Sequence, residues 1–163
     1  MEHESELREL SERLGGACRR QSAQVTTAES CTGGGVAAAI TDIAGSSDYF
    51  ETGYVTYANA SKTRLLNVSD SLLEGYGAVS QETVEAMVKG ACLESGADVG
   101  VAVSGVAGPD GGSDDKPVGT VWFAWGDASR QQSTRYVFEG DRSAVRHQAV
   151  RVALEGLIEW LEK

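Results

Sequence analysis

The segment from residue 25 to residue 40 constrains the fold of this chain more than any other part of its sequence. The β-branched run at residues 25–27 predicts a short strand, and a small polar turn then leads into three consecutive glycines at 33–35. Apolar residues at 36–40 predict a helix directly afterwards. A strand that runs into a glycine-opened helix places Ser30 beside free backbone N–H groups, which could bind an anion or stabilise an oxyanion.

The rest of the chain alternates between helical and strand patterns. Capping residues support several helix starts, with Asn59 and Ser80 expected as N-caps, and Asp141 is expected to begin the last helix. Helices are expected at 5–20, from the glycines to about 43, at 59–66, at 69–76, after residue 80 and after residue 141, and strands at 25–28, 49–57, 98–104, 118–125 and 133–138. This order predicts a single three-layer α/β/α domain over residues 1–163, with a mixed, mostly parallel sheet of about five or six strands.

Charge and cysteine content narrow the functional classes. The net charge of −10 argues against nucleic-acid and membrane-surface binding, because both need basic surface. The acidic N-terminus does not resemble a signal peptide, and no apolar run approaches the ~20 residues that cross a bilayer. The three cysteines have neither CxxC pairing nor zinc spacing, which favours free thiols in a reducing compartment. We therefore expect a cytoplasmic protein with no metal site.

Ser30 is the first candidate nucleophile, although a helix-capping role would also explain a serine here. The two histidines, His3 and His147, are poorly placed to serve it as a base. Lys62 follows a strand end and could be the base if burial lowers its pKa; otherwise it is a solvated surface lysine. Cys31 competes with Ser30, but neighbouring residues of an extended turn point in different directions, so only one of them can face a substrate.

Two further residues accompany this pair. Tyr57 lies at the same strand end as the Lys62 segment, where its phenol could relay a proton, hold a polar group of the substrate, or simply be an edge aromatic. Glu29 could orient Lys62 or cap the following helix, and the sequence leaves both roles open.

A second glycine-rich loop, at residues 104–112, follows the predicted central strand at its carboxyl end, where α/β sheets usually bind ligands. It matches neither a Walker loop nor GxGxxG, which disfavours nucleoside triphosphates and dinucleotides as ligands.

Arg142, with Arg146 one turn later, could supply local positive charge for a phosphate or form surface salt bridges. The expected substrate-binding residues are Glu29, Thr32, Gly33, Gly34, Ser104, Gly105, Gly108, Gly111, Gly112 and Arg142.

Six blocks of the chain together resemble the CinA C-terminal domain family of nicotinamide-nucleotide amidases. The blocks lie at residues 27–34, 53–62, 77–80, 104–112, 116–122 and 140–142, in the family's order. The resemblance implies hydrolysis of nicotinamide mononucleotide to nicotinic acid mononucleotide and ammonia in pyridine-nucleotide recycling, without a cofactor. It implies Ser30 as nucleophile, Lys62 as general base and Tyr57 as a supporting polar group.

The resemblance also leaves alternatives open for the domain organisation and the function of this chain. Some members carry a further N-terminal domain, which is absent from this chain, so the resemblance implies the stand-alone form. A catalytically silent nucleotide-binding or partner-binding domain is the main rival, and a hydrolase of other small amides is a third reading. Trp122 and Trp125, on a hairpin that could form a sheet edge, suggest a possible homo-oligomer.

Overall fold

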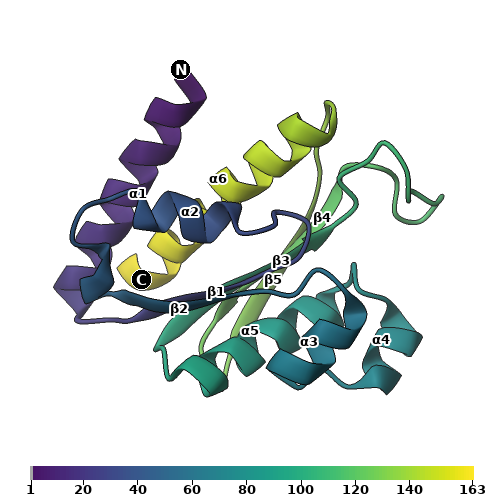
Figure 1. Cartoon of the computed structure of the whole chain (residues 1–163), viewed down its shortest axis with the longest axis horizontal. Helices are drawn as coiled ribbons and strands as arrows, with labels where there is room; N and C mark the ends of the chain where they lie inside the picture. Colours follow the sequence, from purple (N-terminus) through teal and green to yellow (C-terminus); the bar gives the residue numbers. More distant parts are fainter. Residues whose placement is uncertain (1) are drawn as a thin grey trace.

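A five-stranded sheet forms the centre of the computed structural model, which describes residues 2–163, with side chains from Glu4 onward. The strand order is β2-β1-β3-β4-β5 (Figure 1). The strands are β1 (Val25–Glu29), β2 (Phe50–Val55), β3 (Val99–Gly105), β4 (Thr120–Gly126) and β5 (Gln131–Val137). β1 pairs in parallel with both β2 and β3, whereas β3–β4 and β4–β5 are antiparallel. The predicted mixed sheet is confirmed, and its pairings divide evenly between the two kinds.

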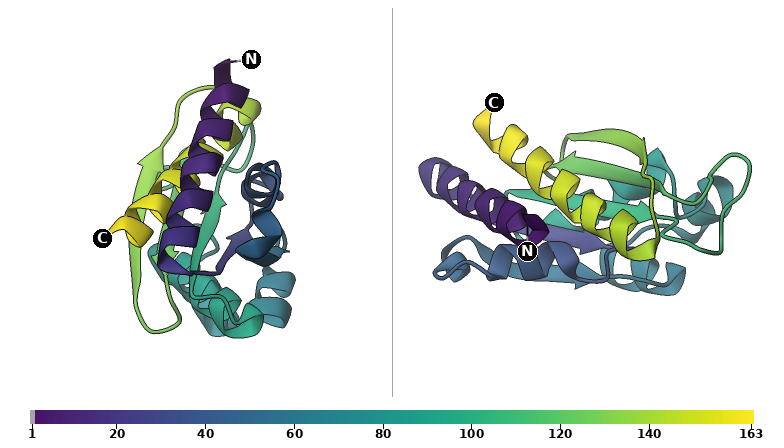
Figure 2. Two further views of the ribbon diagram at one scale, coloured as in Figure 1. Left: turned by 90° about the vertical axis from the view of Figure 1, so that its left-hand side faces the viewer. Right: turned by 90° about the horizontal axis from the view of Figure 1, so that it is seen from above.

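Helices cover both faces of the sheet, which confirms the three layers. One face carries α1 (Glu2–Gln21), α2 (Gly35–Thr41) and α6 (Arg142–Glu162), and the other carries α3 (Asn59–Leu66), α4 (Asp70–Tyr76) and α5 (Gln81–Ser95) (Figure 1). A short 3-10 turn, η1 (Ser46–Asp48), precedes β2. Figure 2 shows α1 and α6, the first and last helices, lying side by side across one face.

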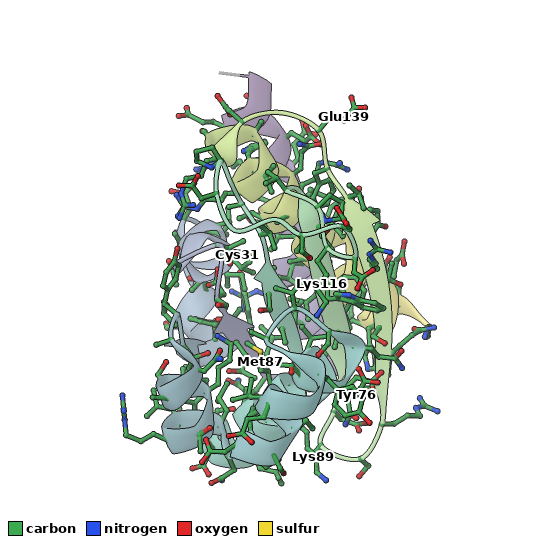
Figure 3. The ribbon with its side chains drawn as sticks, turned by 90° about the vertical axis from the view of Figure 1, so that its right-hand side faces the viewer. Cys31, Tyr76, Met87, Lys89, Lys116 and Glu139 are labelled. Atoms are coloured by element: carbon green, nitrogen blue, oxygen red, sulfur yellow. The ribbon has the colours of Figure 1, made fainter. Side chains whose placement is uncertain are left out.

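The two helical layers enclose two apolar cores. The larger core, which includes Leu14, Val36 and Phe123, lies under α1, α2 and α6. The smaller one includes Met87 of α5 (labelled in Figure 3) and Ala102 of β3. β3 is buried on both faces over nearly its whole length, as a central strand between two helical layers must be. The central strands are therefore fixed from both sides, which gives their carboxyl ends a rigid position.

Most of the expected helix ends are confirmed. The side chains of Ser80 and Asp141 accept backbone N–H groups at the starts of α5 and α6. The expected cap at Asn59 is wrong, because the extended residue at the start of α3 is Ala58, and Asn59 is already helical. α3 therefore begins without a side-chain cap.

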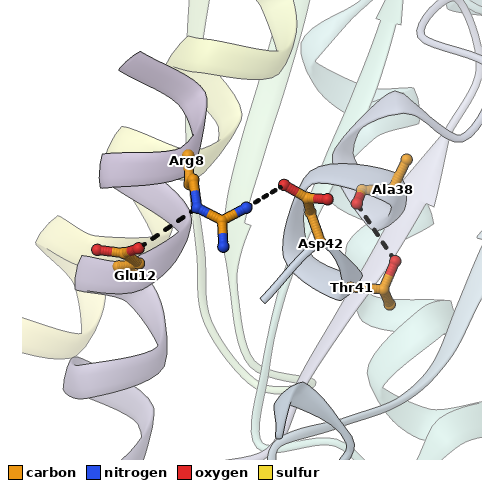
Figure 4. Close-up of polar contacts among 5 residues, drawn as sticks. All are labelled: Arg8, Glu12, Ala38, Thr41 and Asp42. Carbon is orange, nitrogen blue, oxygen red and sulfur yellow. Dashed lines mark hydrogen bonds and ion pairs between the residues drawn. The ribbon is translucent and has the colours of Figure 1, made fainter. Parts of the chain in front are cut away.

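An exposed ion pair links α1 to the end of α2 (Figure 4). Arg8 Nη1 lies 3.0 Å from Asp42 Oδ2, and Arg8 Nε lies 3.6 Å from Glu12 Oε1 on the same helix. All three side chains are more than half exposed, so these pairs contribute little to stability. The contact holds the far end of α2, away from its glycine-rich start.

The two tryptophans of β4 do not form a sheet edge, because β5 pairs along the outer side of β4. Trp125 is buried, and its Nε1 donates to the carbonyl of Ala153 in α6 at 3.0 Å. Trp122 packs beside the smaller core. Self-association stays a prediction without support from these side chains.

Within the described residues, no helix combines the length and apolar character needed to cross a membrane.

Candidate active site

Ser30 follows β1 directly, where the carboxyl ends of three neighbouring parallel strands meet. Its backbone N–H donates to Val103 O of β3 at 2.9 Å, which extends the sheet pairing by one residue. On the other side, Thr56 N donates to Glu29 O at 2.8 Å and continues the β2 pairing. These bonds hold the backbone of Ser30 from both neighbouring strands, and the residue is only 8% exposed.

Lys62 lies in α3, and its side chain reaches Ser30 from the sheet face that carries α3, α4 and α5. Its Nζ is 3.0 Å from Ser30 Oγ, 2.7 Å from the Thr56 carbonyl oxygen and 3.4 Å from the Tyr57 carbonyl oxygen. The side chain is 1% exposed, and no carboxylate among the described residues pairs with it. Burial lowers the pKa of Lys62 from 10.5 to about 8, because the charged form loses its hydration.

These three contacts match the neutral form of Lys62 as well as the charged form. An ammonium group has three N–H donors, which would go to the two carbonyls and to Ser30 Oγ. A neutral amine has two N–H donors for the two carbonyls, which leaves its lone pair for the Ser30 hydroxyl. The geometry therefore suits a base that removes the hydroxyl proton. The sequence predicted this pair, and the structure brings it together.

Cys31 points away from this pair. Its thiol belongs to the larger core on the opposite side of the sheet, and the residue is 5% exposed. Burial raises the pKa of the Cys31 thiol to about 11, so the thiol is protonated at neutral pH. Of the two adjacent candidates, Ser30 is the one that faces the lysine (Figure 3 labels Cys31).

The turn after Ser30 presents free backbone donors. Gly33 N donates to Ser30 O and Gly35 N to Thr32 O, each at 3.0 Å, while Gly33 and Gly34 adopt φ of 58° and 104°. Among the described residues, none accepts a hydrogen bond from the amides of Thr32 or Gly34. Unpaired amides beside a nucleophile are the elements of an oxyanion hole.

Glu29 supports this turn from inside the protein. Its Oε1 accepts from Thr32 Oγ1 at 2.6 Å and from Val36 N at 2.8 Å, and its Oε2 accepts from Ala37 N at 3.0 Å. The residue is fully buried. Of the two roles that the sequence left open, the carboxylate takes the helix cap, where its charge complements the helix N-terminus. This differs from the predicted substrate contact, because both carboxylate oxygens are already bonded within the protein.

Tyr57 contributes its main chain and its side chain to different places. Its carbonyl oxygen lies at the Ser30–Lys62 pair, 3.5 Å from Ser30 Oγ. Its phenol is largely exposed and accepts from Arg142 Nη2 at 2.8 Å. Arg142 Nη1 also donates to Gly108 O at 2.8 Å, so Arg142 joins the end of β2, the start of α6 and the second glycine-rich loop.

The glycines of the second loop are explained mainly by the loop's own packing. A Cβ at Gly108 or Gly112 would collide with Val118, and one at Gly105 would meet the backbone of Thr120 and Val121. Ser104 is buried within β3. Gly111 adopts φ of 94° beside Val106. None of these contacts brings Gly111 or Gly112 to Ser30, whereas Gly108 is connected to the site through Arg142.

The loop is tied to both helical layers. Lys116 Nζ donates to Tyr76 O at the end of α4 at 3.1 Å (both labelled in Figure 3), on the face opposite α6. On the α6 side, a cavity of about 670 Å³ opens between the loop and the helix start. Its lining comprises Ala107, Pro109, Val118, Gly140, Asp141, Arg142, Ser143 and Arg146.

Sequence reasoning gave Arg146 little weight, yet it contacts the turn after Ser30. Its Nε donates to Cys31 O at 3.1 Å and its Nη2 to Thr32 O at 3.2 Å. Its position one helical turn after Arg142 was the available signal. The carbonyl of Thr56, which accepts from Lys62, was also missed, because a main-chain contact leaves no mark in the residue type.

Comparison with known proteins places this geometry in a family. The family model described as CinA C-terminal domain matches residues 7–161. The chain belongs to the CinA C-terminal domain family. The resemblance seen in the six sequence blocks is thereby confirmed.

Similar proteins extend along nearly the whole chain. A Pseudomonas putida protein named nicotinamide-nucleotide amidohydrolase PncC is 65% identical over 150 residues, which are 92% of this chain and 94% of that protein. An Escherichia coli protein of the same name is 54% identical over 155 residues, 94% of each chain. The crystal structure of a CinA superfamily protein from Klebsiella pneumoniae superposes with a TM-score of 0.92 at 42% identity, covering 96% of this chain and 98% of that one. The α/β fold of this family is therefore the fold of this chain.

Proposed function

We propose that this protein hydrolyses the carboxamide of nicotinamide mononucleotide, giving nicotinic acid mononucleotide and ammonia in pyridine-nucleotide recycling. The observation that carries the proposal is the buried amine of Lys62, with its lowered pKa, 3.0 Å from Ser30 Oγ. The names of the two relatives support the choice of substrate. Because Cys18, Cys31 and Cys92 are buried free thiols, we keep the cytoplasm as the expected compartment.

In the first half of the reaction, neutral Lys62 removes the proton from Ser30 Oγ, and Oγ attacks the carboxamide carbon. The carbonyl π electrons move onto oxygen, and the free amides of the turn stabilise this oxyanion. The Lys62 ammonium then gives its proton to the amide nitrogen. The C–N bond breaks, ammonia leaves, and the nicotinoyl group stays on Ser30 as an ester.

In the second half, water repeats the attack on this ester. Lys62 takes a proton from the water as its oxygen bonds to the acyl carbon. The tetrahedral intermediate collapses, the bond to Ser30 Oγ breaks, and Lys62 returns the proton to Oγ. The acid product then releases the second proton of the water to solvent, which leaves the carboxylate of nicotinic acid mononucleotide and free Ser30.

The phosphate of the mononucleotide needs local positive charge in a protein whose net charge is −10. Arg142 supplies it beside the cavity of about 670 Å³, a size typical of small-molecule sites. The exposed phenol of Tyr57 accepts a hydrogen bond from Arg142, which lines this cavity, so Tyr57 lies next to the proposed phosphate site. Tyr57 thus fits the supporting polar role that the resemblance implies.

The test is ammonia release from nicotinamide mononucleotide by the wild type, Ser30→Ala, Lys62→Ala and Cys31→Ala. We expect Ser30→Ala and Lys62→Ala to lose at least about 10³-fold in kcat, as other enzymes do without nucleophile or base. Cys31→Ala should keep most of the activity, because its protonated thiol lies in the core. A fully active Ser30→Ala protein would remove the mechanism.

The rival, a silent nucleotide-binding domain, makes a different prediction. It expects calorimetry to detect the mononucleotide bound to the wild type while no ammonia appears. Turnover of other carboxamides without turnover of the mononucleotide would favour the third reading, a different small-amide hydrolase.

A further inference from the structure

Arg146 lies on α6, yet its guanidinium group holds the turn that follows the nucleophile. Two of its N–H groups, on Nε and Nη2, donate to the successive carbonyls of Cys31 and Thr32. The guanidinium fork is planar and rigid, so it fixes the directions of both carbonyls together. These contacts join residues 115 and 114 positions apart in the chain.

The direction of the Cys31 carbonyl determines the direction of the next amide. In a trans peptide the C=O and the following N–H point in opposite directions, and the Cys31–Thr32 peptide is trans. Because the Cys31 carbonyl points to α6, the Thr32 N–H points away from α6. The opposite face of the sheet is the one that carries α3 and Lys62 (Figure 1). No described residue accepts from this N–H.

Thr32 is also fixed from two other sides. Its hydroxyl donates to Glu29 Oε1 at 2.6 Å, and its carbonyl accepts from Gly35 N at 3.0 Å in addition to Arg146. The residue is 1% exposed. A donor held this firmly needs no reorganisation when charge develops in front of it, which is the condition for strong transition-state stabilisation.

We propose that Arg146 is a positioning residue that directs the Thr32 amide at the developing oxyanion. This inference rests on the proposed function. When Ser30 Oγ bonds to the carboxamide carbon, the carbonyl π pair moves onto oxygen and accepts a hydrogen bond from Thr32 N–H. Arg146 touches neither Ser30 Oγ nor the substrate oxygen. It binds the Cys31 carbonyl and thereby orients and polarises the Cys31–Thr32 peptide.

A direct contact between Arg146 and the substrate phosphate is the competing role, since the side chain also lines the cavity. The two roles affect different kinetic constants. Loss of a ground-state contact raises KM, whereas loss of a contact made only in the transition state lowers kcat.

The first experiment compares Arg146→Met, which keeps the apolar stem, with Arg146→Lys, which keeps a donor. We expect Arg146→Met to lower kcat at least about tenfold with KM within about twofold, and Arg146→Lys to lose less. The matched control is Arg151→Met on the same helix, because Arg151 pairs with Glu6 and Glu155, both away from the site. Its kcat should equal that of the wild type. The rising pH limb set by Lys62 should not move in any of the three.

The second experiment needs no turnover of the mononucleotide. A fluorophosphonate reagent, whose phosphoryl oxygen develops negative charge as Ser30 attacks, should label Ser30 more slowly in Arg146→Met than in the wild type. Thermal unfolding of each variant reports whether it is folded. If Arg146→Met does not fold, the same comparison with Arg146→Lys decides.

The outcomes separate this inference from the proposed function. Slower labelling in folded Arg146 variants, in a protein that leaves the mononucleotide intact, would support the positioning role and reject the substrate. Wild-type kcat and labelling in folded Arg146 variants, or a change confined to KM, would overturn the positioning role and leave the amidase standing. Absence of both turnover and labelling in the wild type would overturn both.

Discussion

Lys62 is an ionisable side chain that is almost completely buried. Its partners are one hydroxyl and two main-chain carbonyls, none of which carries a negative charge. Burial removes the hydration of the ammonium form and lowers the pKa of Lys62 to about 8. This lowered pKa suits the proposed role of Lys62 as a base near neutral pH, for which no histidine is needed.

The pH dependence of the reaction follows from this pKa. Only the neutral amine can accept the Ser30 proton, so kcat/KM should rise as pH rises and level off above about 8. At pH 7 about one tenth of Lys62 would be in the active form. Initial rates of ammonia release between pH 6 and 10 measure this.

A matched variant tests the assignment of that limb. Tyr57→Phe should keep it, because the carbonyl of Tyr57, not its phenol, contacts Lys62. A flat profile in the wild type, or a fall over this range, would contradict the role of Lys62.

The same pKa predicts how stability depends on pH. In the unfolded chain Lys62 titrates near 10.5 and in the folded protein near 8, so between these values the unfolded state holds more protons. The free energy of unfolding therefore gains from Lys62 as pH rises through this window. The penalty is complete below pH 8, where it amounts to about 3 kcal/mol, and it is gone above 10.5.

Lys62→Met removes this titration, so the difference between the two proteins isolates it. Relative to Lys62→Met, the wild type should gain about 2 to 3 kcal/mol of unfolding free energy between pH 7 and pH 10. Urea unfolding at several pH values measures the difference. A difference that stays constant with pH would mean that Lys62 titrates normally.

At the scale of elements, α3 carries Lys62, the proposed base, and its position depends on a close helix contact. Gly90 of α5 lies against the main chain of Leu66 at the end of α3, and a Cβ at Gly90 would collide with the Leu66 carbonyl. Because α3 begins without a side-chain cap, this contact and the burial of Lys62 and Leu66 hold it in place. The distance between Lys62 and Ser30 therefore depends on a residue that touches neither.

Gly90→Ala should push α3 away from α5 and reduce both activity and stability. We expect kcat to fall at least about tenfold, because small displacements of a catalytic group have large effects. The free energy of unfolding should fall by about 1 to 3 kcal/mol. Steady-state rates and urea unfolding of the same sample compare the two effects.

Gly75→Ala is the control in the same layer, because no described atom beyond the neighbouring backbone of its own helix lies within 4 Å of its Cβ position. It should change stability by less than about 1 kcal/mol and leave kcat unchanged. Equal activities of the two alanine variants would show that the α3–α5 contact does not set the site geometry.

Sequence patterns predicted the elements better than the partners of buried polar groups. The caps at Ser80 and Asp141 are local, so residue type and spacing sufficed. Ser30 and Lys62 were predictable because both follow ends of parallel strands, which meet at one sheet edge. Arg146 was not, because its partners are two carbonyls more than a hundred residues away, and any residue type supplies a carbonyl.

At the scale of the molecule, the proposed substrate site joins three distant parts of the chain. Arg142 bridges Tyr57 and Gly108, and the cavity lies between the second loop and α6. A ligand that binds across these parts stabilises the folded state by mass action.

Nicotinamide mononucleotide should therefore raise the unfolding temperature of Ser30→Ala, which cannot consume it. At 100 times the Kd the gain would be about 2.7 kcal/mol. Nicotinamide riboside, which lacks the phosphate, should give a smaller shift at the same concentration, and Arg142→Ala should reduce the difference between the two ligands. Equal shifts with both ligands would show that the phosphate is not recognised.

The contacts of α6 also have a consequence for protein synthesis. Ser30 is translated more than a hundred residues before Arg146, the α6 residue that contacts the turn behind it. Because α1 packs mainly on α6, the first helix must also wait for the last. A nascent chain that has not yet reached α6 thus carries the Ser30 hydroxyl without the Arg146 contacts that fix the turn behind it.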